Sequence, residues 1–329
     1  FVLVTRPISF YPISFEKKII PKIWGGKKIE NFFSLESLEK NIGESWEVSV
    51  IREFVSVVNN GFFKNKKLDA LIEKYPIEIL GEKVYTKYGI KFPLLIKFID
   101  VSKPLSIQVH PNDEIAKVRH NSFGKNETWF IIETEKNANL SVGFNKKIDK
   151  KTFSKNLKNK TIEQLLNSFD VKPKDAFYIP AGTIHALNGK MLLLEVQQSS
   201  DITYRIHDYD RLDPKTGRKR KLHKELAVSS INFSKNKNEK IKYDSIRNEL
   251  NPVIENDFFK IYYLKTNGKE TKKIFMNKSF WVFVCLEGLF SIHWENKEQP
   301  FKKGGTFLIP SVLNFVNIRG HGEIIAITT

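Results

Sequence analysis

Residues 104–112 have the sequence Pro-Leu-Ser-Ile-Gln-Val-His-Pro-Asn, in which polar and apolar side chains alternate. On a β-strand, residues two positions apart point to the same face. Ser106, Gln108 and His110 therefore share one face, and the residues between them are apolar. The alternation predicts a strand at 105–109, with two potential metal ligands side by side on one face and core residues on the other.

A second informative stretch, at 180–189, has the sequence Pro-Ala-Gly-Thr-Ile-His-Ala-Leu-Asn-Gly. Pro180 ends one predicted strand and Gly182 turns the chain. His185 then starts the next strand with its side chain directed inward. His185 is therefore a further candidate ligand.

The rest of the chain predicts many short strands separated by turns, which is typical of a sandwich or barrel. Further strands are expected at 46–50, 92–100, 127–133, 176–179, 191–197 and 203–206, and again within 252–329. Helices are expected at 67–88 with a break at Pro76, at 149–168 and at 221–231, after an extended lead-in at 7–24. The polar segment 210–245 indicates a boundary, so we expect one domain at 1–240 and another at 241–329.

Composition limits the class of protein. The chain has 329 residues, of which 41% are hydrophobic and 28% are charged, as in a soluble protein of one large or two medium domains. It has no apolar run near the roughly 18 residues of a membrane span and no recognisable signal peptide, so we expect no membrane partner. The single cysteine, Cys285, excludes a disulfide within the chain and favours a reducing, cytoplasmic location.

The formal net charge of +17 raises the question of an anionic partner. Lysines are spread along the whole chain, and the densest basic run, Arg218–Lys221, is predicted to be a solvated loop. We therefore expect no nucleic-acid partner. The opposite hypothesis requires an affinity for DNA or RNA that falls steeply with salt.

The order of the motifs resembles the cupin superfamily. Gln108-x-His110 followed by Glu127 is similar to the first cupin motif, and Pro180-x-Gly-x-x-His185 is similar to the second. Longer strings resemble type I mannose-6-phosphate isomerases in their short bacterial form. These strings are Gly43-Glu-Ser-Trp-Glu-Val-Ser49, Pro93-Leu-Leu-Ile-Lys-Phe-Ile-Asp100, the stretch 104–112, Gly124-Lys-Asn-Glu-Thr-Trp129, Ala181-Gly-Thr-Ile-His-Ala-Leu187 and Leu194-Glu-Val-Gln-Gln-Ser-Ser-Asp-Ile-Thr-Tyr-Arg205.

The resemblance implies a mainly β fold with two cupin domains, the first of which holds one metal ion. The residues that match the family's metal ligands are Gln108, His110, Glu127 and His185. Nitrogen and oxygen ligands without thiolate suit Zn²⁺, and also Fe²⁺, Mn²⁺ or Co²⁺. The second domain is expected to be a degenerate cupin without a metal, because Asn314 stands near the position where a ligand histidine is expected.

The resemblance also implies the interconversion of mannose 6-phosphate and fructose 6-phosphate through an enediol. Arg205 matches the catalytic arginine of the family, and Glu195 is the preferred base or proton shuttle, although a metal-bound hydroxide or another group is an open alternative. The expected substrate-binding residues are Lys97, Lys125, Ser106 and Asp201, with the two lysines holding the phosphate.

Two other functions are compatible with a cupin fold. A metal-dependent oxygenase predicts a His-x-His first motif, whereas Gln108 occupies the first position here. A non-catalytic sugar-binding cupin has no use for Arg205 together with Glu195. The expected partner is thus a small phosphorylated sugar, and the expected assembly is a monomer or a weak homodimer.

Overall fold

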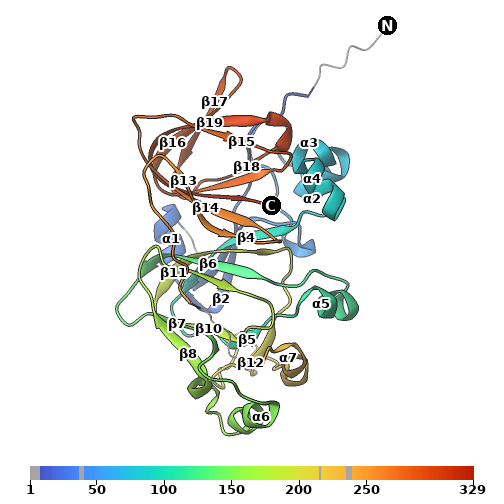
Figure 1. Ribbon diagram of the computed structural model, residues 1–329, viewed down its shortest axis with the longest axis vertical. Helices are drawn as coiled ribbons and strands as arrows, with labels where there is room; N and C mark the ends of the chain where they lie inside the picture. The colour runs from blue at the N-terminus through green and yellow to red at the C-terminus, as the bar shows by residue number, and fades with distance from the viewer. Residues whose placement is uncertain (1–7, 37–40, 215, 235–238) are drawn as a thin grey trace. The chain divides into compact units, whose positions relative to one another are not determined.

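The structure is a computed structural model that describes residues 8–36, 41–214, 216–234 and 239–329 (Figure 1). The chain forms two compact units. Unit 1 comprises Phe1–Glu16, Val55–Phe92 and Tyr243–Thr329, and unit 2 comprises Lys17–Phe54 and Pro93–Lys242. This division differs from two contiguous domains that meet at 240, because strands from both ends of the chain pair in unit 1.

Unit 2 contains two β-sheets. The six-stranded sheet has the order β2-β3-β4-β11-β6-β9, and the five-stranded sheet has the order β12-β5-β10-β7-β8. The strands of the first sheet are β2 (Lys18–Gly26), β3 (Ile42–Val48), β4 (Leu94–Val101), β11 (Met191–Gln198), β6 (Glu127–Thr134) and β9 (Ala176–Ile179). Those of the second are β12 (Tyr204–His207), β5 (Ile107–Val109), β10 (His185–Asn188), β7 (Asn139–Phe144) and β8 (Leu166–Asp170).

Large apolar side chains fill the space between these sheets. Trp129 and Phe177 from the six-stranded sheet belong to the same buried cluster as Leu140 and Leu187 from the five-stranded sheet. Burying such a side chain stabilises the fold by about 1.5–3 kcal/mol. The two sheets therefore share one core.

The centre of the six-stranded sheet positions two charged residues. Strands β4 and β11 are buried along their whole length. Both are mostly apolar, as expected for strands covered on both faces. Lys97 on β4 and Glu195 on β11 break these apolar runs, and their Cα atoms are register partners. A buried charge is costly unless it is paired, so the register places each side chain beside its counter-ion.

Helices cover the outer face of the five-stranded sheet. Phe153 of α6 (Lys150–Lys158) and Ala227 of α7 (Lys224–Ser230) pack with Ile107 and Val109 of β5 (Figure 1). The other helices of unit 2 are α1 (Lys28–Phe33), α5 (Asp113–His120) and the 3₁₀ segments Arg52–Phe54 and Ile162–Leu165.

The predicted helix at 149–168 is α6 only as far as Lys158, and after a break the 3₁₀ segment Ile162–Leu165 precedes a strand. Lys160 adopts a left-handed conformation with φ of 57°, which ends the helix. Leu166 instead begins β8, which pairs with β7. The short helix α5 was not predicted. Its Asn112 cap accepts a 3.0 Å hydrogen bond from the backbone N–H of Ile115.

Unit 1 is built around an eight-stranded antiparallel sheet with the order β1-β18-β16-β19-β14-β13, to which β15 and β17 are added. Its strands are β1 (Ile13–Ser14), β13 (Leu250–Glu255), β14 (Lys260–Asn267), β15 (Lys272–Phe275), β16 (Trp281–Trp294), β17 (Lys297–Lys302), β18 (Thr306–Ile309) and β19 (Phe315–Thr328). Because Ile13 pairs with Leu308, the lead-in belongs to this sheet.

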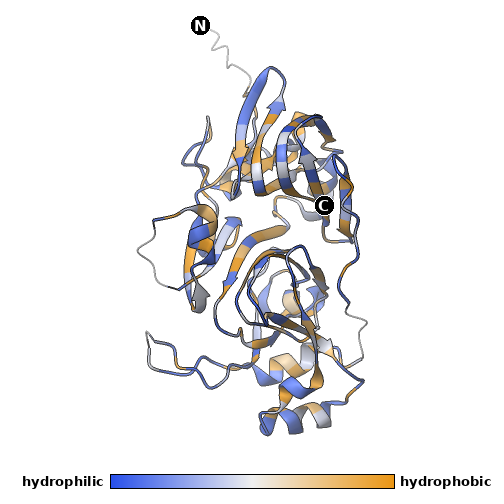
Figure 2. Ribbon diagram, turned by 90° about the vertical axis from the view of Figure 1, so that its left-hand side faces the viewer, coloured by the Kyte–Doolittle hydropathy of each residue, from blue (hydrophilic) through white to orange (hydrophobic). Residues whose placement is uncertain are grey.

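The predicted helical region 67–88 forms three short helices of unit 1, namely α2 (Leu68–Lys74), α3 (Pro76–Leu80) and α4 (Glu82–Tyr88). Unit 1 also has a 3₁₀ turn at Ser311–Leu313, between β18 and β19. Pro76 makes the predicted break, and Gly81 makes a second one. Figure 2 shows polar and apolar residues interleaved along the strands, as expected when one face of a sheet is buried.

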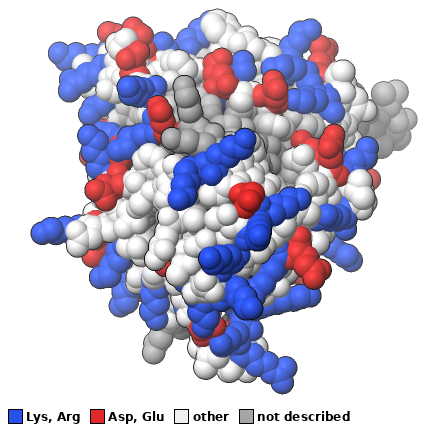
Figure 3. All heavy atoms as spheres, turned by 60° about the horizontal axis from the view of Figure 1, so that its bottom comes forward, with Lys and Arg blue, Asp and Glu red and all other residues white. Residues whose placement is uncertain are grey.

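Helix length and surface charge bear on membrane and nucleic-acid partners. Among the described residues, no helix is long and apolar enough to cross a membrane. Lysine and arginine side chains are scattered over the face seen in Figure 3, with acidic side chains between them.

Candidate metal centre

The two candidate histidines are oriented by the protein backbone. His110 lies directly after β5, and its Nδ1 is 2.8 Å from the carbonyl oxygen of Ile202. The Nδ1 of His185, at the start of β10, is 2.8 Å from the carbonyl oxygen of Thr183. Since a carbonyl only accepts, each Nδ1 donates, which leaves the Nε2 lone pairs available as ligands. Burial lowers the pKa of both histidines, so both rings are neutral.

Glu127 completes a group of three buried ligand atoms that lie within 4.8 Å of one another. One carboxylate oxygen, Oε1, is 3.3 Å from Nε2 of His185, and the other, Oε2, is 3.4 Å from Nε2 of His110. Oε1 is buried and has no hydrogen-bond partner among the described residues. Burial and the neighbouring Glu195 raise the pKa of Glu127 against the effect of Lys125. The distances and the unpartnered oxygen fit a metal ligand, and a bound cation would favour the deprotonated carboxylate that coordination requires.

The Lys125 ammonium lies among the three candidate ligand atoms, so a positive charge already faces them. Its Nζ contacts Oε2 of Glu127 and is 3.2 Å from Nε2 of His110. Gln108 reaches the same point, because its Nε2 is 3.2 Å from Nε2 of His185. Rotating the Gln108 amide by half a turn replaces this nitrogen with Oε1, which is a suitable ligand. The residues present thus fit one divalent metal ion.

A second carboxylate lies beside this group. Glu195 receives three donors: Lys97 at 3.1 Å and Lys125 at 3.2 Å from Oε1, and the Trp129 indole at 2.7 Å from Oε2. Burial alone raises the pKa of Glu195, but these donors outweigh burial and lower it to about 2. Glu195 is therefore ionised at neutral pH. Lys125 joins the two carboxylates, since its Nζ contacts both Glu127 and Glu195.

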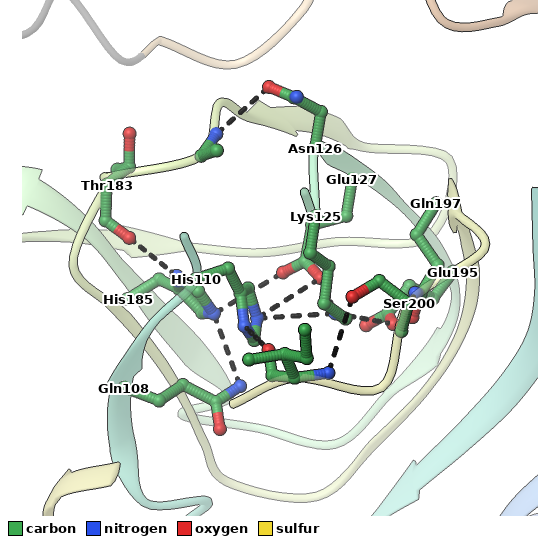
Figure 4. Close-up of polar contacts among 12 residues, drawn as sticks. Gln108, His110, Lys125, Asn126, Glu127, Thr183, His185, Glu195, Gln197 and Ser200 are labelled. Carbon is green, nitrogen blue, oxygen red and sulfur yellow. Dashed lines mark hydrogen bonds and ion pairs between the residues drawn. The ribbon is translucent and has the colours of Figure 1, made fainter. Parts of the chain in front are cut away.

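Hydrogen bonds hold the ligand-bearing segments together (Figure 4). Asn126 Oδ1 accepts hydrogen bonds from the Ala181 N–H at 3.0 Å and from the Tyr178 hydroxyl at 3.1 Å. The Asn126 amide in turn donates to Gln198 Oε1 at 2.7 Å. Asn126 thus ties the strand of Glu127 to the turn that precedes His185.

The remaining predicted residues line a cavity of about 330 Å³ in unit 2. This cavity brings together the predicted residues Lys97, Ser106, Gln108, Lys125, Glu195, Asp201 and Arg205. The Ser106 hydroxyl is 3.5 Å from Gln108 Oε1, whereas Asp201 is exposed. The imidazoles of His110 and His185 and the carboxylate of Glu127 are almost fully buried.

Sequence reasoning missed several cavity residues, of which three carry informative contacts. Glu44 and Trp46 of β3 line it, and the Trp46 indole donates to Glu44 at 2.8 Å. Their signal was present, because both lie in the string at 43–49. Arg220 also lines the cavity and pairs with Asp208 at 2.5 Å. The run Arg218–Lys221 was predicted to be a solvated loop. This prediction fails for Arg220, whose side chain turns inward to a buried carboxylate.

Two family models match parts of this chain. The model of the type I phosphomannose isomerase catalytic domain matches residues 14–135, and that of the mannose-6-phosphate isomerase cupin domain matches 248–329. Mannose-6-phosphate isomerase ManA of Bacillus subtilis is 33% identical over 98% of this chain and 99% of its own length. The mannose-6-phosphate isomerase of Streptococcus mutans is 31% identical over 96% and 97%, respectively.

A crystal structure of the Bacillus subtilis mannose 6-phosphate isomerase superposes with a TM-score of 0.87 at 32% identity, covering 96% of this chain and 99% of the other. The likeness thus extends over nearly the whole chain in sequence and in fold. This protein belongs to the type I family of mannose-6-phosphate isomerases.

Proposed function

We propose that the chain interconverts mannose 6-phosphate and fructose 6-phosphate in this cavity, with one divalent metal ion held by Gln108, His110, Glu127 and His185. The observation that carries the proposal is the Lys125 ammonium, which contacts Glu127 and is 3.2 Å from Glu195. A metal-ligand group and a carboxylate able to accept a proton thus lie within reach of one small substrate.

The reaction moves a proton between two adjacent carbons through an enediol. It needs a base beside these carbons and positive charge beside the oxygens. A divalent metal held by Gln108, His110, Glu127 and His185 would polarise the substrate oxygens. Glu195 is ionised and accepts the proton, and its basicity rises when substrate hydroxyls take over the donors of Lys97 and Lys125. Arg205 keeps its proton and stabilises negative charge on the substrate.

The other cavity residues position the sugar. Lys97 and Lys125 are buried and paired with carboxylates, so they are held at fixed positions from which they can donate to sugar oxygens. Ser106 lies beside Gln108 and adds a hydroxyl, and Asp201 accepts from sugar hydroxyls at the exposed part of the cavity.

We further infer that the metal is Zn²⁺, because the four ligands supply nitrogen and oxygen in the pattern of an open, catalytic zinc site. Residues 1–240 contain all four ligands, so residues 241–329 serve as scaffold. The single cysteine is buried and free, which suits a chain that works in the cytoplasm, and we propose a monomer or weak homodimer.

The test is a coupled assay of mannose 6-phosphate isomerisation, combined with metal analysis of the purified protein. We expect turnover with one metal ion per chain, loss of turnover with a chelator and recovery with Zn²⁺. His110→Ala and His185→Ala should lose both metal and turnover, whereas His321→Ala, which is exposed in unit 1, should retain both. Absence of turnover by the fully metallated protein rules out the activity, and normal metal content in both ligand variants rules out the ligand assignment.

A further inference from the structure

The Lys125 ammonium depends on a loop for its position. It contacts Glu127 and is 3.2 Å from Glu195 (Figure 4), but Lys125 itself lies in the loop 121–126, which joins α5 to β6. A lysine side chain is a flexible stem of four carbons. A fixed loop backbone is therefore a condition for keeping the ammonium between the two carboxylates.

Two backbone N–H groups attach this loop to the segment that follows His110. The Lys125 N–H donates to the carbonyl oxygen of Pro111 at 3.1 Å, and the Gly124 N–H donates to Oδ1 of Asp113 at 2.7 Å. Gly124 lets the two backbones approach, because an added Cβ would lie 2.6 Å from the backbone nitrogen of Asp113. The loop of Lys125 is thus joined to the segment that carries a proposed metal ligand.

The Asp113 carboxylate has a second donor, which comes from the six-stranded sheet. Gln198 Nε2 donates to the same oxygen, Oδ1, at 3.0 Å. Oε1 of Gln198 accepts from the backbone N–H of Asn126 at 3.0 Å and from its side-chain amide at 2.7 Å. Gln198 is the last residue of β11, the strand of Glu195. Asp113 therefore binds the residue before Lys125 directly and the residue after it through Gln198.

Asp113 makes these contacts from outside the buried core. Its side chain is exposed in the first turn of α5, whose one buried residue is Ala116. Glu114 is an exposed acidic residue of the same turn, but it has no hydrogen bond or ion pair among the described residues. The two neighbours share charge and exposure, and only Asp113 is connected to the loop of Lys125.

We propose that Asp113 is a positioning residue for the isomerisation, which holds the loop 121–126 so that the Lys125 ammonium stays between Glu127 and Glu195. It acts through Lys125 and does not touch the substrate. A carboxylate suits this role, because one oxygen accepts from two donors and charge-assisted hydrogen bonds are stronger than neutral ones. The inference rests on the proposed function for the reaction, whereas the hydrogen bonds that carry it do not depend on the identity of the substrate.

The first test compares the kcat of Asp113→Ala and Asp113→Asn at saturating Zn²⁺, with Glu114→Ala as the control that removes the same charge from the same helical turn. For Asp113→Ala we expect kcat to fall by about tenfold, as the loss of a charge-assisted hydrogen bond predicts. Asp113→Asn keeps an oxygen acceptor and should stay within about threefold of the wild type. Glu114→Ala should match the wild type.

A double-mutant cycle with Lys125→Gln separates positioning of Lys125 from a general structural role. Because Asp113 acts through Lys125, adding Asp113→Ala to Lys125→Gln should lower kcat by less than about twofold. A tenfold loss in both backgrounds overturns the proposal, as does an Asp113→Ala variant with the kcat of the wild type.

Amide hydrogen exchange tests the loop without turnover, so it decides when the activity of Lys125→Gln is too low to measure. In Asp113→Ala, exchange in the peptide that contains Gly124 and Lys125 should become about tenfold faster, while exchange in β10 stays as in the wild type. Asp113→Asn should restore the slow exchange. Unchanged exchange at Gly124 and Lys125, or faster exchange throughout unit 2, contradicts the assigned role. If the wild type itself does not isomerise mannose 6-phosphate, the proposed function fails and the exchange result still decides on Asp113.

Discussion

The indole N–H of Trp129 donates a 2.7 Å hydrogen bond to Oε2 of Glu195, and the Trp129 ring stands edge-on to His185 at a centroid distance of 5.4 Å. One buried side chain thus touches both the proposed proton acceptor and a proposed metal ligand. Trp129→Phe keeps an aromatic ring and removes the donor. We expect kcat to fall by about tenfold or more, because a hydrogen bond to a charged group contributes about 1.5–3 kcal/mol.

Trp294→Phe is the matched control for this change, because the Trp294 indole is buried in unit 1 and has no hydrogen-bond partner among the described residues. Its kcat and KM should equal those of the wild type. An unchanged kcat in Trp129→Phe shows that the indole does not position Glu195.

Gly182 supplies the turn that delivers His185. Its φ is +85°, and an added Cβ would lie 2.9 Å from the carbonyl oxygen of Ser230. Gly182→Ala should therefore destabilise the protein by about 1–3 kcal/mol and weaken metal binding. Urea unfolding and competition with a chelator measure the two effects. Gly217→Ala has a similar φ of +65° but open space around its Cβ, so it should lose less stability and keep the metal affinity of the wild type.

Asn126 connects the two halves of the site, so its removal should loosen both. Asn126→Ala leaves the half-buried N–H of Ala181 without its acceptor, which costs about 1 kcal/mol or more of stability. Metal affinity should drop by about ten- to a hundredfold, as expected when an outer-shell partner is lost. Asn188→Ala, at the exposed end of β10, should change neither quantity. Equal metal affinity in Asn126→Ala and wild type contradicts the assigned role.

Asp100 predicts a pH dependence of stability. Burial raises its pKa to about 6, against the N–H donors of Ile29 and Lys28 and the Lys28 charge, and Glu133 adds to the rise. Because this pKa exceeds the unfolded value of 3.8, the folded state holds the proton longer. The free energy of unfolding should therefore fall as pH rises from about 4 to 6. Above pH 6 it should stay at this lower level, because Asp100 is then ionised in both the folded and the unfolded state.

Asp100→Asn removes this titration. Between pH 4 and pH 7, the unfolding free energy of Asp100→Asn should gain about 2 kcal/mol relative to the wild type. Denaturant unfolding across this range measures the difference, and a constant difference excludes a raised pKa for Asp100.

Local periodicity predicted those parts of the site whose residues share one strand or one turn. The alternation at 105–109 placed Ser106 and Gln108 on one face, and the turn at Gly182 delivered His185 to the start of β10. It failed where pairing between distant segments decides. Ile162 and Leu165 lie in a 3₁₀ segment, but the predicted helix does not continue, because Leu166 begins β8 and pairs with β7.

Charge patterns were equally ambiguous without long-range information. Arg220 belongs to an exposed basic run in sequence, and only the fold brings Asp208 beside it. Lys97 and Glu195 are separated by 98 positions in the sequence, and only the register of β4 against β11 pairs them. Periodicity did not predict the helix α5, because Ala116 is its one buried residue and the helix has almost no apolar face.

Because unit 1 is built from three separate segments of the chain, it affects the order in which the two units can fold during translation. Strand β19 pairs with β14, β15 and β16 in the middle of that sheet, and it is translated after every residue of unit 2. The segments at 8–16 and 55–92 must therefore wait for their partners while Lys17–Phe54 and Pro93–Lys242 are already available to fold. The nascent chain can thus build its metal-ligand group before the sheet of unit 1 exists.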